Sequence, residues 1–151
     1  MPDGSTFGGF ERFDRLTAEA RSALMARIRA KDTTPERRVR SLLHGMGYRF
    51  RLHARDLPGT PDVVLRPRRK AIFVHGCFWH RHAGCAGATV PRTREAFWAD
   101  KFDRNVRRDA RTRRALNRAG WSVCVVWECQ AAAARRDPSA LEARLRRFLD
   151  G

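Results

Sequence analysis

The chain has 151 residues, of which 32 are Lys or Arg and 16 are Asp or Glu, giving a formal net charge of +16 at neutral pH. A hydrophobic content of 42% excludes wholesale disorder, and the length fits one compact domain. No apolar run approaches the roughly 18 residues of a membrane helix, and no apolar block follows a basic start, so we expect a soluble, intracellular (cytoplasmic) protein with no membrane partner.

The amino-terminal residues predict an arm and a first helix. Residues 1–14 contain glycines and no hydrophobic periodicity, which is typical of a flexible arm, and residues 15–151 are expected to form a single domain. Within that domain a first helix is expected at about residues 18–29, where apolar residues recur at near-helical spacing.

A second helix has clearer boundary signals. Thr33 and Glu36 match a capping box, and Pro35 suits the first helical turn. Apolar residues then recur at helical spacing until Gly47, which ends the helix.

Strand and helix signals alternate in the rest of the chain. The expected strands are residues 48–52, 62–65, 71–74 and 121–127, and the expected helices are about residues 94–119 and from Pro138 onward. In the long helix, Trp98, Phe102, Val106 and Ala110 form the expected buried stripe, and the other faces are strongly basic. Three successive strands and a fourth after a helix predict an α/β fold, with a mixed central sheet flanked by helices.

The basic character of the chain points to a polyanionic partner. Neutralising phosphates releases condensed counterions and requires Lys and Arg on one surface, so nucleic acid is the first candidate. An anionic membrane surface is less favoured, because the basic stretches lack the apolar face of an interfacial helix. Arg108 and Arg111 of the long helix are interpreted as a phosphate-tracking or merely solvated face.

Four cysteines and a histidine-rich segment indicate a metal centre. Cys77, His82 and Cys85 lie within nine residues, and Cys129 follows the last strand. Three Cys and one His match a closed, tetrahedral, structural zinc site. Cys124 lies within a strand and is expected to be a buried, inert thiol. The alternative, that all four are core thiols, is disfavoured because a loop rich in Gly and His cannot build a core.

The other histidines divide into two groups. His44 and His53 are expected to be ordinary surface residues, whereas His75 and His80 lie close to the predicted metal loop. Asp62 is the first residue of one predicted strand, and the next predicted strand in the chain leads to His75. Phosphodiester hydrolysis needs a metal, a base and an acid, and a Pro-Asp pair ahead of such strands is typical of restriction-endonuclease-like nucleases.

Four segments together carry a family resemblance. They are residues 58–62 (Pro-Gly-Thr-Pro-Asp), 73–80 (Phe-Val-His-Gly-Cys-Phe-Trp-His), 92–98 (Arg-Thr-Arg-Glu-Ala-Phe-Trp) and 126–129 (Val-Trp-Glu-Cys). In this order they closely resemble the very short patch repair (Vsr) DNA mismatch endonucleases, over about residues 21–129. Those enzymes nick DNA beside the thymine of a T:G mismatch left by deaminated 5-methylcytosine.

The resemblance implies a restriction-endonuclease-like fold and a role for individual residues. Asp62 and the main-chain carbonyl of Val74 would bind catalytic Mg²⁺, His80 would be the general base, and His75 and Glu36 would support the hydrated metal and the phosphate. The structural zinc ligands would be Cys77, His82, Cys85 and Cys129, and the wedge entering the duplex would comprise Met25, Phe78 and Trp79.

The same resemblance implies an enzyme that acts on double-stranded DNA with a T:G mismatch, associated with the nucleoid and with mismatch-repair proteins as further partners. A monomer is expected, since nicking one strand does not call for a dimer. Two alternatives remain open: a nuclease of the same fold with another DNA substrate, and a non-catalytic zinc-containing DNA-binding module. The chain departs from the family pattern at Val74, where many members have threonine, and in the two-residue spacer between His82 and Cys85.

Overall fold

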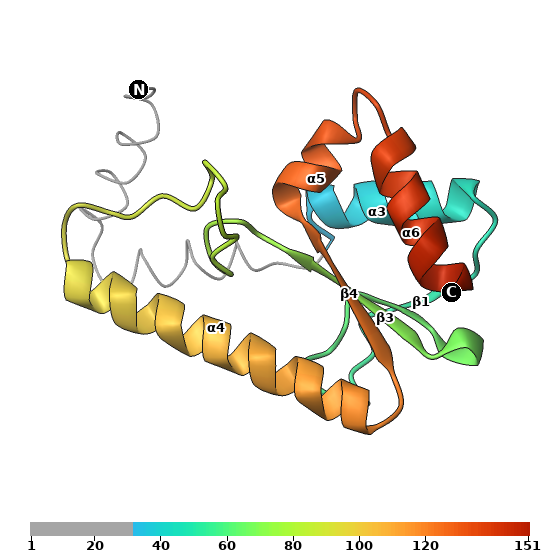
Figure 1. The fold of residues 1–151 in the computed structure, drawn as a ribbon, viewed down its shortest axis with the longest axis horizontal. Coiled ribbons are helices and arrows are strands. Elements are labelled where there is room, and N and C mark those ends of the chain that lie inside the picture. The colour runs from blue at the N-terminus through green and yellow to red at the C-terminus, as the bar shows by residue number, and fades with distance from the viewer. Residues whose placement is uncertain (1–31) are drawn as a thin grey trace.

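A four-stranded sheet forms the centre of residues 32–151, the part of the chain that the computed structural model describes (Figure 1). The strands are β1 (Arg51–Leu52), β2 (Val63–Leu65), β3 (Lys70–His75) and β4 (Ser122–Trp127), in the order β1-β2-β3-β4. The first two pairings are antiparallel, and β3 and β4 run parallel. The predicted mixed sheet is therefore confirmed. The predicted arm, the helix at residues 18–29 and Met25 lie outside the described residues.

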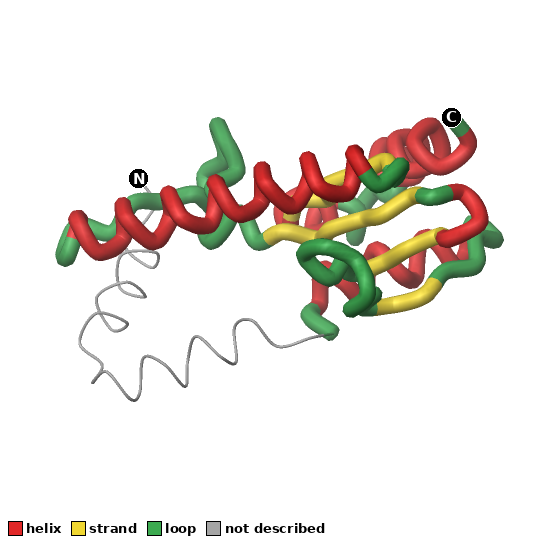
Figure 2. The backbone as a smooth tube through the Cα atoms, turned by 90° about the horizontal axis from the view of Figure 1, so that it is seen from below, coloured by secondary structure: helices red, strands yellow, loops and turns green. Residues whose placement is uncertain are grey.

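Helices cover both faces of this sheet (Figures 1 and 2). On one face lie α3 (Thr34–Gly45), α5 (Glu128–Ala133) and α6 (Ser139–Asp150), which pack Val39, Leu43 and Leu145 against Ile72 and Val126 of the sheet. On the other face lies α4 (Glu95–Arg118), which packs Leu116 against Val64, Phe73 and Val125. None of the helices within residues 32–151 is long and apolar enough to span a membrane.

The element boundaries differ from prediction in a few places. The strand expected at residues 48–52 contains only Arg51–Leu52, because its partner β2 is three residues long and gives way to a 3-10 helix at Arg66–Arg68. Tyr48 and Phe50 instead pack on the core. The short helix α5 is not among the predicted elements; its first turn is stabilised by the Gln130 side chain, which accepts from the Trp127 N–H at 3.0 Å. Cys124 is buried in the core, as predicted.

The buried stripe of α4 also runs differently from prediction. Trp98 and Phe102 are buried, but Asn105 and Leu116 continue the stripe, and Val106 is 45% exposed. Steps of four residues advance by about 40° more than a full turn, so a stripe read at i+4 three times in succession drifts away from the sheet. The true stripe places Asp109 and Thr112 toward the rest of the fold, which matters for the site.

The turn before β2 is pressed against α4. Gly59 has a φ of +72°, and a Cβ atom built there would lie 2.3 Å from Thr112 Cγ2. Only glycine satisfies both the left-handed backbone and this close approach. The contact fixes the position of the turn that leads directly to Asp62.

Replacing Gly59 with Ala is expected to lower the free energy of unfolding by about 2 kcal/mol or more, because it combines left-handed strain with overpacking. Chemical denaturation measures the loss, with Gly45→Ala as the control, since nothing lies within 4 Å of a Cβ at Gly45. Adding Thr112→Ala to the Gly59→Ala variant should restore part of the stability. Equal stability of the two single glycine variants would contradict the packing described here.

Candidate active site and metal centre

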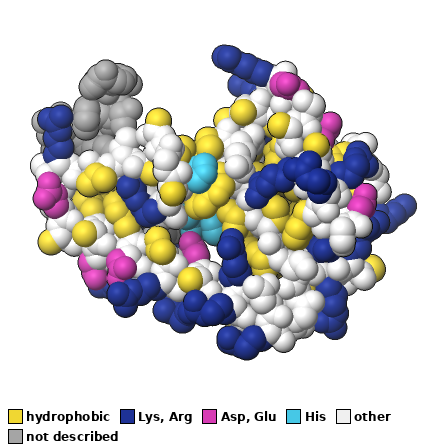
Figure 3. Space-filling view, viewed as in Figure 1, with side chains coloured by type: hydrophobic (Ala, Val, Ile, Leu, Met, Phe, Trp, Pro, Cys, Tyr) yellow, Lys and Arg dark blue, Asp and Glu magenta, His cyan; other side chains and the backbone are white. Residues whose placement is uncertain are grey.

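A cleft of about 1420 Å³ opens where α3, the end of β3, the loop after β3 and α4 meet. Histidine side chains appear in the hollow at the middle of the face shown in Figure 3. The residues lining the cleft include five of those predicted from sequence to serve catalysis, through side chain or main chain: Glu36, Asp62, Val74, His75 and His80. Residues far apart in the chain thus converge on one concave surface.

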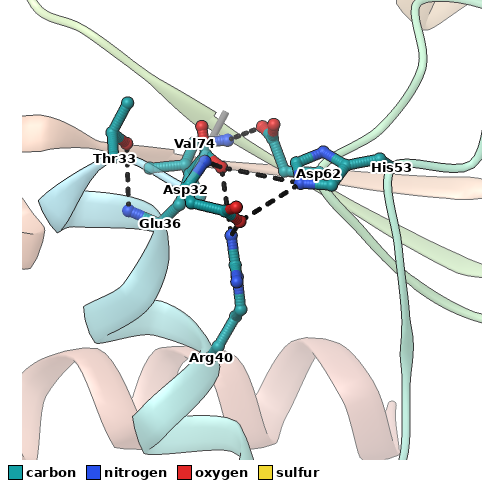
Figure 4. A network of polar contacts seen from close by, with 7 residues as sticks. All are labelled: Asp32, Thr33, Glu36, Arg40, His53, Asp62 and Val74. Atoms are coloured by element: carbon teal, nitrogen blue, oxygen red, sulfur yellow. Dashed lines mark hydrogen bonds and ion pairs between the residues drawn. The ribbon is translucent and has the colours of Figure 1, made fainter. Parts of the chain in front are cut away.

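Asp62 is held by the backbone of the neighbouring strand. Its Oδ2 accepts a hydrogen bond of 2.7 Å from the Val74 N–H (Figure 4). Burial raises the pKa of Asp62 to about 6, the hydrogen bond from Val74 opposes this rise, and the charge of Glu36 adds to it. A buried carboxylate with so little compensating charge is a favourable ligand for a divalent cation, which prefers oxygen donors.

A polar network lies beside Asp62. Arg40 donates hydrogen bonds to the carboxylates of Asp32 and Glu36, and the bond to Glu36 measures 3.4 Å (Figure 4). His53 was expected to be an ordinary surface residue, and this is wrong: its Nε2 lies 3.6 Å from Asp32 Oδ1 and 4.0 Å from Glu36 Oε1. Its backbone N–H also donates to the Asp62 carbonyl at 3.1 Å. His44, by contrast, is exposed as predicted.

The same network modifies the predicted helix cap. Thr33 Oγ1 accepts from the Glu36 N–H at 3.4 Å, as a capping box requires. The Glu36 carboxylate, however, accepts from the Asp32 N–H at 3.0 Å. Glu36 therefore contributes to the N-terminal cap of α3 and also faces the cleft beside Asp62.

Two stacked histidines form the opposite side of the site. The His75 and His80 rings are parallel within 7°, with centroids 3.8 Å apart. Burial lowers the pKa of His75 to about 3, and the neighbouring His80 contributes to this decrease, so His75 is neutral at physiological pH. A neutral buried imidazole can bind water or metal-bound water without adding charge to the site.

Asp109 of α4 holds His80 and was not identified from sequence. His80 Nδ1 lies 2.6 Å from Asp109 Oδ2, and both side chains are about three-quarters buried. A carboxylate in this position selects the tautomer with hydrogen on Nδ1 and leaves Nε2 as an acceptor. In the sequence, Asp109 stands among arginines and looks like a compensating surface charge. Tracing the α4 stripe through Asn105 would have placed it inward.

The aromatic pair Phe78 and Trp79 lines the cleft and also packs on α4. Both side chains are half-buried. Phe78 makes edge contacts with Trp98 and Phe102, at centroid distances of 5.6 and 5.1 Å. The Asn105 side chain donates to the Trp79 carbonyl at 3.0 Å. The segment is therefore held against a rigid helix with part of its aromatic surface left open.

The four residues predicted to bind zinc lie together. One possible ligand atom from each of Cys77, His82, Cys85 and Cys129 falls within 4.8 Å of the others. His82 Nδ1 lies 3.6 Å from Cys77 Sγ and 3.4 Å from Cys129 Sγ. Tetrahedral zinc with ordinary Zn–S and Zn–N bonds separates nitrogen and sulfur ligands by about 3.6 Å. The donor set and its spacing therefore fit zinc.

The local structure of the metal loop supports this arrangement. Gly84, with a φ of +72°, forms a turn in which the Cys85 N–H donates to the His82 carbonyl at 3.3 Å. The two-residue spacer therefore still brings Cys85 into the group. Burial raises the pKa of Cys129 and that of Cys77, the latter to about 12, so metal binding must displace protons from these thiols.

Replacing Asp62 with Asn is expected to stabilise the protein at neutral pH in Mg²⁺-free buffer. The folded-state pKa of about 6 exceeds the ordinary aspartate pKa of 3.8. The carboxyl group therefore favours folding most below about pH 4, and that contribution is lost as the pH rises through 6. Asn avoids this loss, so its advantage should be absent at pH 4 and reach on the order of 1–2 kcal/mol above pH 6. Urea unfolding across this pH range measures the difference in the free energy of unfolding between the variant and the wild type.

The control is Asp56→Asn, at an exposed site paired with Arg66, which should show no increase in the free energy of unfolding. A difference for Asp62→Asn that does not change with pH would contradict the effect of burial on Asp62.

Comparison with known proteins identifies the family of this chain. The family model for the DNA mismatch endonuclease Vsr matches residues 13–86. The type II nicking enzyme V.XorIIP of Xanthomonas oryzae pv. oryzae is 53% identical over 91% of this chain and 97% of its own length. The DNA mismatch endonuclease Vsr of Escherichia coli is 48% identical over 72% of this chain and 69% of its own. The type II nicking enzyme V.NmeAIP of Neisseria meningitidis is 38% identical over 78% and 83%, respectively. The chain therefore belongs to the Vsr family of DNA mismatch endonucleases, and its α/β architecture is that of a nuclease.

Proposed function

We propose that this protein is a Mg²⁺-dependent endonuclease that nicks DNA immediately 5′ to the thymine of a T:G mismatch, as the first step of very short patch repair. One observation carries the proposal: Asp62 and His80, from separate elements, line one cleft in a chain of the Vsr family. The net charge of +16 supports a DNA partner. Because one cleft holds one catalytic set, a monomer suffices to cut one strand.

The catalytic residues divide the work of hydrolysis. Asp62, together with the main-chain carbonyl of Val74, would hold Mg²⁺, which neutralises charge developing on the phosphate. His80 takes a proton from the attacking water through Nε2, since Asp109 occupies Nδ1 and favours the resulting imidazolium. The P–O3′ bond then breaks: the water oxygen stays on phosphorus as part of a 5′-phosphate, and the 3′ oxygen takes a proton from solvent in the cleft and leaves as a 3′-hydroxyl. Glu36 and His75 face the same cleft, where they would orient water around the metal and the phosphate.

Phe78 and Trp79 would provide the mismatch preference. An aromatic wedge that enters a base step must unstack it, which costs a few kcal/mol and costs least where pairing is already defective. Their packing on Trp98 and Phe102 holds the wedge in place before DNA arrives. The preference for T:G would therefore come partly from the deformability of the mismatch. Met25 would complete the wedge.

Zinc would hold the loop that carries the wedge and His80. Cys77, His82 and Cys85 flank or follow this segment, and Cys129 lies in the first turn of α5 beyond β4. A metal joining the four would tie the loop to the end of the sheet. The Cys77 N–H, which donates to Glu128 Oε1 at 3.3 Å, reinforces the same connection.

The protein is expected to nick a T:G duplex in a methylation context only with Mg²⁺, and Asp62→Asn should slow nicking by about a thousand-fold or more while DNA binding persists. Denaturing electrophoresis of an end-labelled strand locates the cut and its 5′-phosphate. Asp56→Asn, which removes an equal charge at an exposed site, should nick at the wild-type rate. Equal cutting of the fully paired duplex would indicate another substrate, and bound but intact T:G duplex would indicate a non-catalytic module.

Replacing Cys129 with Ser is expected to abolish stoichiometric zinc and to lower the free energy of unfolding by several kcal/mol, because structural zinc binds only the folded chain. Metal analysis of the purified protein and thermal melting measure both effects. Cys124→Ala is the control, since this buried thiol belongs to the hydrophobic core and should leave the zinc content unchanged. Full zinc content in the Cys129→Ser variant would reject the proposed ligand set.

A further inference from the structure

The arginines of α4 fall into two classes that the sequence does not separate. Arg107 forms an ion pair of 3.0 Å with Asp103, and Arg104 pairs with Asp100, each at i,i+4 spacing. These two arginines are already neutralised on the exposed surface of the helix. After Asp109, by contrast, α4 contains no acidic residue, although four arginines follow it.

The second class consists of arginines that line the cleft without an acidic partner, and it includes Arg108, just before Asp109, and Arg113, after it. Within residues 32–151 neither makes a hydrogen bond or an ion pair. Arg113 lies one helical turn beyond Asp109, the partner of His80, and Arg108 immediately precedes it. Unpaired guanidinium groups beside a catalytic centre are suited to an anionic ligand.

The part of α4 that carries Arg108 and Arg113 is fixed in position relative to Asp62. Thr112 lies between the two arginines in sequence and packs against Gly59, three residues before the catalytic carboxylate. Asp109 fixes the same stretch of α4 to His80. A strand whose scissile phosphate lies between Asp62 and His80 would run through the cleft that Arg108 and Arg113 also line. Figure 3 shows that Lys and Arg side chains follow the edge of the molecule where α4 lies.

We infer that Arg108 and Arg113 bind phosphates of the cut DNA strand on either side of the scissile linkage. This inference rests on the proposed function and names residues that hold its substrate. The two positions are separated by about 7.5 Å along the helix axis, so each guanidinium can contact a different phosphate. Arg104 and Arg107, neutralised by their own acids, contribute little to this contact.

The helix itself offers a competing explanation for the arginines. Cations near a helix C-terminus interact favourably with the helix dipole, which would make the arginines stabilising and not DNA-binding. The effect falls off within the last turn, where Arg118 lies, and Arg108 stands ten residues earlier. The two explanations differ in what a substitution changes: DNA affinity and its salt dependence in one case, thermal stability in the other.

Two double variants with the same loss of charge separate these cases. Arg108→Gln with Arg113→Gln removes the cleft pair, and Arg104→Gln with Arg107→Gln removes the neutralised pair. Affinity for the T:G duplex is measured by fluorescence anisotropy across a KCl series without divalent metal, so that binding is read without cleavage. The cleft variant should lose about two units from the slope of log K against log[salt], one per phosphate contact, and bind about ten-fold or more weakly. The control variant should keep the wild-type slope.

The outcomes distinguish failure of this inference from failure of the proposed function. Equal slope changes in the two variants, or a fall in melting temperature without a change of slope in the cleft variant, would overturn the inference even if the wild type nicks T:G DNA. Wild-type protein that binds DNA with the predicted slopes but cuts no T:G duplex would overturn the proposed function alone. If the glutamine pair fails to fold, Arg108→Lys with Arg113→Lys is expected to fold and to retain the slope, and loss of the slope there would also reject the phosphate contacts.

Discussion

The hydrogen bond from the Val74 N–H to Asp62 joins the start of one strand to the end of its neighbour, and the site is built around it. The antiparallel ladder between β2 and β3 ends at Val63 and Ile72. Beyond that point Pro61 would face Val74, but proline has no N–H to continue the ladder, and its carbonyl already accepts from the Ala54 N–H at 3.2 Å. The carboxylate of Asp62 therefore takes the place of a main-chain acceptor. The proposed metal ligand is fixed by the same bond that ends the strand pairing.

The cleft wall formed by α4 depends on a second set of contacts, made by one side of a single long helix. Asn105 binds the Trp79 carbonyl, Asp109 binds His80, and Thr112 packs against Gly59. These residues are spaced by four and three positions, so they share one face of the helix. Each contacts a different segment: the loop with Phe78 and Trp79, the proposed base His80, and the turn before Asp62. A rigid helix is thus the common reference that sets the positions of three separately folded segments.

The sequence predicted the sheet, its mixed character and the convergence of Asp62 with His80, because strand patterns and the residues at strand ends are local features. It also predicted the cysteine and histidine group, whose spacing is a strong local signal. Asp109 and His53 could not be recognised in the same way, since their importance comes from which face of a helix or strand end meets a distant residue. The α4 stripe shows the difficulty. A small error in helical phase predicted that Val106 is buried, although it is exposed, and left unrecognised that Asp109 faces inward and contacts His80.

The apolar core and the polar cleft occupy different parts of this fold, although α3 and α5 contribute residues to both the core and the proposed sites. The side of the sheet covered by α3, α5 and α6 holds the larger apolar cluster and no residue of the proposed catalytic pair. The other end carries a buried carboxylate, a buried neutral histidine and thiols with raised pKa values, each of which costs free energy in the absence of a ligand. Metal ions and a phosphate chain are the groups that would relieve these costs. If these ligands bind as proposed, part of the free energy of binding would be used to position the strand for cleavage.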